Sequence, residues 1–98
     1  MNEAPTKPKI EFLVAAEIEP PYRVLIHNDD VTPMDFVVRV LTRIFELPLS
    51  RAEQVMLAAH FTGRALVSVL AREEAKHRVG QAHAAARAAG YPLKFTIE

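Results

Sequence analysis

Apolar residues recur in six regular segments of the chain, all of them after residue 21. Residues 22–27, 64–70 and 92–98 are short and rich in β-branched or aromatic residues, which predicts three strands. Residues 34–45 and 72–89 repeat apolar side chains at the spacing of one helix face, which predicts two helices. With a further helix before the second strand, the predicted order is β-α-α-β-α-β.

Polar residues and prolines mark where the first two helices are expected to begin. Thr32 is a suitable N-cap and Pro33 a suitable first helical residue, and Pro48 should end that helix. Ser50 and Glu53 match a capping box, which predicts the second helix over roughly residues 51–61. The inner face of this second helix is expected to carry Ala52, Val55, Met56 and Ala59.

Three strands and three helices predict an α+β fold, in which helices cover one face of a mainly antiparallel, three-stranded sheet. Residues 1–21 hold four of the seven prolines and show no clear period. We therefore expect a flexible N-terminal extension over 1–21 and a single folded domain over 22–98.

Composition narrows the functional classes. Lys plus Arg number 12 and Asp plus Glu number 12, so the chain lacks the basic excess typical of nucleic-acid-binding proteins. The absence of cysteine excludes disulfides, thiolate nucleophiles and cysteine zinc sites. No run approaches the roughly 18 apolar residues of a membrane span, and the first residues lack the pattern of a secretory signal. We therefore expect a cytoplasmic protein that binds neither membranes nor nucleic acid.

Asn28, Asp29 and Asp30 form a polar turn between the first strand and the first helix. One interpretation is a plain acidic loop. Another is a receptor for a free α-amino group, whose three N–H donors would be satisfied by the Asn28 amide oxygen, an Asp30 oxygen and a histidine nitrogen. A Ca²⁺ or Mg²⁺ site is a third interpretation, but the turn lacks the spaced ligands of an EF-hand loop.

Nearby apolar residues and His60 leave similar alternatives open. His60, one turn after Met56, is either a half-buried histidine bonded to a carbonyl or an acceptor for the same amine. Met34, Val37 and Met56 are either core or the wall of an adaptable apolar pocket. The other helical histidines, His77 and His83, are interpreted as surface residues. No HExxH motif, glycine-rich phosphate loop or Ser-His-Asp set is recognisable, so no enzyme is predicted.

Three motifs of the chain closely resemble the signatures of the ClpS family. They are residues 22–37 (YRVLIHNDDVTPMDFV), residues 56–65 (MLAAHFTGRA) and residues 91–93 (YPL), in the order and spacing of the family. The resemblance covers roughly residues 22–98. It implies a non-catalytic adaptor without a cofactor or metal. Such an adaptor binds substrates whose first residue is Leu, Phe, Tyr or Trp and delivers them to a ClpA-type AAA+ unfoldase coupled to the ClpP peptidase.

The same resemblance implies a role for individual residues. Asn28, Asp30 and His60 would hold the α-amino group, with Asp29 supporting the negative turn. Thr32 would shape the loop. The hydrophobic pocket would be lined by Met34, Val37, Met56, Ala59 and Leu93, and Met34 would exclude β-branched first residues. The unfoldase would contact Glu73 and Arg78, with Val31 near the edge of that surface.

Four positions depart from the common family pattern, and one of them, Arg78, replaces a lysine and keeps the charge. Val31 stands where a tyrosine is frequent, which affects unfoldase docking. Ala59 stands where a valine is common and His27 where an aliphatic residue is common. If both border the pocket, it is roomier or more polar than in relatives.

Two other functions remain open from the residues alone. One is a protein-docking module that ignores a free N-terminus, and the other is a metal-dependent enzyme using Asp29, Asp30 and His60. We expect a monomer.

Overall fold

The structure, a computed structural model, describes residues 21–98. The predicted extension over 1–21 lies outside the described residues, apart from Pro21. The elements follow the predicted order: β1 (Tyr22–His27), α2 (Met34–Arg43), α3 (Leu49–Thr62), β2 (Arg64–Leu70), α4 (Arg72–Ala89) and β3 (Lys94–Ile97).

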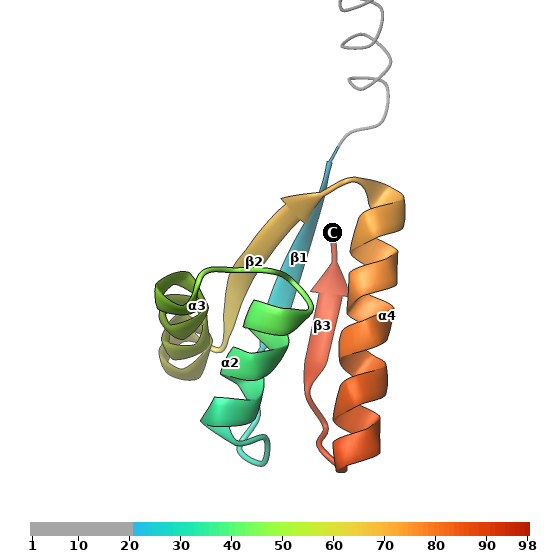
Figure 1. The fold of residues 1–98 in the computed structure, drawn as a ribbon. Helices are drawn as coiled ribbons and strands as arrows, with labels where there is room; N and C mark the ends of the chain where they lie inside the picture. The colour runs from blue at the N-terminus through green and yellow to red at the C-terminus, as the bar shows by residue number, and fades with distance from the viewer. Residues whose placement is uncertain (1–20) are drawn as a thin grey trace, which may run out of the picture.

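The sheet is antiparallel throughout, with β1 in the centre and the strand order β2-β1-β3. Figure 1 shows α2 and α3 on the β2 side of the molecule and α4 along β3. Val24 and Ile26 of β1 point into one core that receives buried side chains from all three helices. The predicted α+β architecture, with helices covering one face of the sheet, is confirmed.

Both predicted helix caps are wrong. Helix α2 begins at Met34, and Pro33 occupies the N-cap position. The helix has no side-chain cap, because the Thr32 hydroxyl donates to Asp29 instead. Helix α3 begins at Leu49, directly after Pro48, whose backbone is extended. Ser50 is therefore already inside the helix, where its side chain is too late to act as an N-cap.

The last strand is shorter than predicted, and one helix of small residues packs closely beside it. Strand β3 starts at Lys94 instead of residue 92, where a proline has no N–H for the sheet. Buried small side chains let α4 approach the sheet: Ala75, Ala82 and Ala86.

His83 is not the surface residue that the sequence suggested. Its Nε2 atom accepts the Phe95 backbone N–H over 2.9 Å, so α4 satisfies a donor of β3 that faces away from β1. Burial and, after it, the Arg87 guanidinium hold the pKa of His83 below its ordinary value of 6.5. A neutral ring is also what an Nε2 acceptor requires.

Stability should consequently fall as the pH is lowered from above 6.5 toward the depressed pKa of His83. In that window the unfolded chain binds a proton that the folded chain refuses, so ionisation favours unfolding, whereas above pH 6.5 the contribution is complete. Urea denaturation at pH 7.5 and 5.5 measures the difference. His83→Gln keeps an acceptor without titrating and should show a smaller pH dependence, whereas His77→Gln on the exposed face should match the wild type. An unchanged pH dependence in His83→Gln would contradict this role.

Candidate functional site

Strand pairing places the turn after β1 beside the end of α3. Strand β2 begins at Arg64, close behind α3, and Arg64 pairs with His27 at the end of β1. The next backbone N–H, that of Asn28, donates to the Gly63 carbonyl over 2.9 Å. Asn28 therefore lies next to the last turn of α3, which carries His60.

The carboxylate of Asp29 is used by its own loop. Its Oδ1 atom accepts the backbone N–H groups of Val31 and Thr32 over 2.8 and 2.7 Å, and its Oδ2 atom accepts the Thr32 hydroxyl over 2.9 Å. Partial burial raises the pKa of the Asp29 carboxyl, but these hydrogen bonds outweigh burial and hold the pKa below 3.8. Asp29 thus stays ionised and fixes the shape of the turn.

Asp30 and His60 are not used in this way. Both side chains are exposed, and within residues 21–98 no hydrogen bond or ion pair involves either of them. The His60 ring packs at a steep angle against the neighbouring Phe61 ring, with 5.0 Å between centroids. Adjacent carboxylates at residues 29 and 30 therefore differ in function: one builds the turn and the other has free acceptors.

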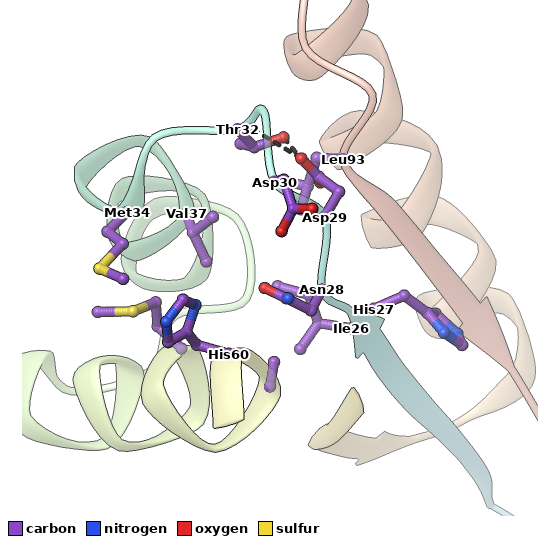
Figure 2. Close-up of a pocket in the computed structure, with 12 residues that line it drawn as sticks. Ile26, His27, Asn28, Asp29, Asp30, Thr32, Met34, Val37, His60 and Leu93 are labelled. Atoms are coloured by element: carbon purple, nitrogen blue, oxygen red, sulfur yellow. Dashed lines mark hydrogen bonds between the residues drawn. The ribbon is translucent and has the colours of Figure 1, made fainter. Parts of the chain in front are cut away.

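A cavity of about 180 Å³ opens between this turn, α2 and α3. Figure 2 shows Met34 and Val37 of α2 facing His60 of α3, with Asn28 on the third side. The volume is smaller than the roughly 300 Å³ at which pockets for drug-sized ligands begin, so it suits a single side chain. The lining residues are Ile26, His27, Asn28, Asp29, Asp30, Thr32, Met34, Val37, Met56, Ala59, His60 and Leu93.

All ten residues that the sequence suggested for the amine and the pocket thus lie around one cavity. Ala59, which departs from the family pattern, is buried and lines the cavity. The ring of His27 turns away from the cavity and forms a 2.7 Å hydrogen bond between its Nε2 atom and Thr96 Oγ1, so it does not make the pocket polar. Ile26 also lines the cavity, and the sequence did not predict this. Its place next to His27 in the strand, with its side chain on the opposite, core-facing side of the sheet, is the signal that could have identified it.

Over residues 21–98, no three His, Asp or Glu side chains are grouped so that they could hold a metal ion. No helix in the same part of the chain has the length and apolarity needed to cross a membrane.

Residues 17–96 match the family model described as ATP-dependent Clp protease adaptor protein ClpS. The chain belongs to the ClpS family. Individual members agree: a ClpS adapter protein of Xanthomonas campestris pv. campestris (strain 8004) is 49% identical over 84 residues, which cover 84% of this chain and 79% of that protein. ClpS 1 of Bradyrhizobium diazoefficiens is 40% identical over 98 residues, covering 100% of this chain and 97% of the relative.

A solved structure shares the ClpS fold. The structure of Agrobacterium tumefaciens ClpS2 bound to L-phenylalaninamide is 38% identical to this chain, with a TM-score of 0.78, and the match covers 82% of this chain and 96% of the other.

The three residues that ClpS resemblance implies for unfoldase docking do not lie together. The loop with Val31 is at one end of the fold and the first turn of α4, with Glu73, at the other (Figure 1). The side chain of Arg78 is only 18% exposed and is bonded internally. Its guanidinium donates to the Ile44 carbonyl over 2.7 Å and to Glu74 Oε2 over 2.7 and 3.0 Å, and so holds the end of α2 against α4.

Proposed function

We propose that this chain is a cytoplasmic adaptor that binds substrates beginning with Leu, Phe, Tyr or Trp and delivers them to a ClpA-type unfoldase coupled to ClpP. The observation that carries the proposal is the pairing of two features at one site. Free acceptors on Asn28, Asp30 and His60 surround the mouth of an apolar cavity of one-side-chain size. That combination suits a charged amine attached to a carbon that also bears a large apolar group.

The α-ammonium group would donate to the Asn28 amide oxygen, an Asp30 oxygen and an unprotonated nitrogen of His60. Each of these hydrogen bonds to a charged group contributes roughly 1.5–3 kcal/mol before ordering costs. The negative charge of Asp29, held ionised by its loop, adds to the attraction at longer range. The mouth of the cavity thus favours a cation over a neutral or acetylated N-terminus.

The first side chain would enter the space between α2, α3 and Leu93. Burial of a Leu or Phe side chain contributes roughly 1.5–3 kcal/mol. With the amine contacts and the loss of freedom on association, a net of about −8 kcal/mol corresponds to a Kd of about 1 μM. An affinity in this range suits an adaptor that must release its substrate to the unfoldase. The ClpS2 structure with L-phenylalaninamide supports this use of the cavity, since that ligand carries a free amine and a benzyl group.

Met34 stands at the mouth, where it would contact Cβ of the first residue. It is the first residue of α2 and is 46% exposed. A β-branched residue places a second substituent on Cβ and has little freedom in χ1, so it would have to leave a preferred rotamer to pass Met34. Leu and Ile side chains are isomers, but only Ile is branched at Cβ, so this pair tests the role of Met34 directly.

The test is therefore a fluorescence-anisotropy titration of labelled peptides that differ only in their first residue. Peptides starting with Leu, Phe, Tyr or Trp should bind. The Ile peptide should bind about two- to tenfold more weakly than its Leu isomer, the effect of an off-rotamer side chain. Met34→Ala should narrow the difference between Leu and Ile. Equal binding of all first residues, Ser included, would sink the proposed function and favour a docking module that ignores the N-terminus.

For unfoldase docking, we propose the first turn of α4. The Glu73 side chain is exposed there, and within residues 21–98 no hydrogen bond or ion pair involves it. Arg78 would support this surface mainly by holding α2 and α4 together, and Val31 would lie outside it.

A further inference from the structure

Phe61 is an exposed aromatic residue next to the mouth of the cavity. It is 78% exposed, more than any other large apolar residue of the described chain, and it does not line the cavity itself. Its ring forms a T-shaped contact with the ring of His60, with 5.0 Å between the centroids. Leu57, one helical turn earlier, is also exposed and continues the apolar surface along α3.

Exposed apolar surface that is contiguous and rimmed by polar residues is typical of contact surfaces, whereas single scattered apolar residues are not. The core of α3 does not need Phe61, because Ala52, Val55 and Ala59 form its buried face. Phe61 and Leu57 therefore form an exposed apolar surface on the solvent side of α3, which we call the lip. It adjoins His60, one of the residues proposed to bind the amine.

We infer that Phe61 and Leu57 form a second subsite, which contacts the side chain of the substrate's second residue and favours apolar and aromatic residues there. The inference rests on the proposed function, because it places the first residue in the cavity and the amine at His60. With those two groups fixed, the carbonyl of the first residue must leave through the mouth. The next Cα lies 3.8 Å further on, and the Phe61 ring, whose centroid is 5.0 Å from that of His60, is the exposed aromatic surface beside the amine-binding edge.

The opposite side of the mouth is less suited to this contact. There the turn of Asp29 is closed by its own hydrogen bonds, and Asp30 separates the cavity from Val31. Val31 is nevertheless exposed and apolar, so it is the competing lip that the experiment must distinguish from Phe61.

The experiment compares two labelled peptides, Leu-Phe and Leu-Ser at positions one and two, with an otherwise identical sequence. Wild-type protein should bind Leu-Phe about three- to tenfold more tightly, as expected for partial burial of one apolar side chain. Phe61→Ser should weaken Leu-Phe to the level of Leu-Ser and leave Leu-Ser nearly unchanged. Leu49→Ser is the matched control, because Leu49 is equally apolar, 59% exposed and about 18 Å away along α3.

Each other outcome overturns the inference. Equal weakening of both peptides by Phe61→Ser would mean that Phe61 only positions His60. Loss of the preference in Val31→Ser instead would place the second residue on the other lip. No preference in the wild type would mean that the second side chain touches neither. Failure of the proposed function is distinct, because the titration of peptides that differ only in their first residue would then show no preference.

Discussion

Acetylation of the N-terminus of a Leu-initiated peptide should weaken its binding by at least about a hundredfold. The acetyl group removes the positive charge and two of the three N–H donors that Asn28, Asp30 and His60 would bind. Loss of hydrogen bonds to a charged group at roughly 1.5–3 kcal/mol each gives at least this factor. Anisotropy titration of the free and acetylated forms of one peptide measures it.

The protein side of the same contact provides a cross-check. His60→Ala and Asp30→Ala should each weaken the free peptide about ten- to hundredfold and leave the acetylated peptide unchanged. Both side chains are exposed, so the variants should remain folded. His77→Ala, an exposed histidine on α4, is the matched control. Full affinity in His60→Ala, or equal losses for both forms of the peptide, would remove these residues from amine recognition.

The order of elements was predictable because apolar residues recur at helix or strand spacing between breaks marked by prolines, glycines and polar residues. The helix starts were not, because they depend on competition between neighbours. Thr32 had the right chemistry for an N-cap, but the Asp29 carboxylate lies within reach of its hydroxyl and backbone N–H. Ser50 fitted a capping box, but Pro48 already permits the helix to begin at residue 49.

The cavity was harder to predict than the fold. Met34, Val37 and Met56 recur at the same spacing whether they fill a core or line a pocket, so their pattern alone cannot distinguish the two. The difference between a core and a pocket depends on where the turn after β1 lies. The hydrogen bond from Asn28 to Gly63, two residues far apart in the sequence, places that turn beside the end of α3, and a cavity opens there. The family resemblance supplied this information, because a motif match carries the tertiary arrangement along with the residues.

Residues of the same chemical type also had roles that only the structure separates. Asp29 and Asp30 are identical in the sequence, yet one is surrounded by donors of its own loop and the other is not. Arg78 and Glu73 lie on one helix, yet Arg78 is tied to the Ile44 carbonyl and Glu73 is exposed. In both pairs, the contact that separates the two residues involves backbone atoms of other residues. The positions of those atoms cannot be inferred from a pattern of side chains.

The turn of Asp29 suggests that shape and charge at the site can be separated by mutation. Asp29→Ala removes all three hydrogen bonds that define the loop, so Asn28 and Asp30 would lose their fixed positions. Binding of a Leu-initiated peptide should weaken about ten- to thirtyfold, since ordering the loop must then be achieved on binding. Asp29→Asn removes the charge and retains an oxygen acceptor for the N–H groups of Val31 and Thr32. Its NH2 group takes the place of Oδ2, so the Thr32 hydroxyl would accept there instead of donating.

Asp29→Asn should therefore weaken the peptide by no more than about threefold, the size of a screened charge effect at a partly exposed site. Thr32→Val tests the third hydrogen bond alone and should give an intermediate loss. All three variants can be compared by the same anisotropy titration, with circular dichroism to verify folding. Losses of equal size in Asp29→Asn and Asp29→Ala would show that the charge of Asp29, and not the turn it builds, is what the bound amine requires.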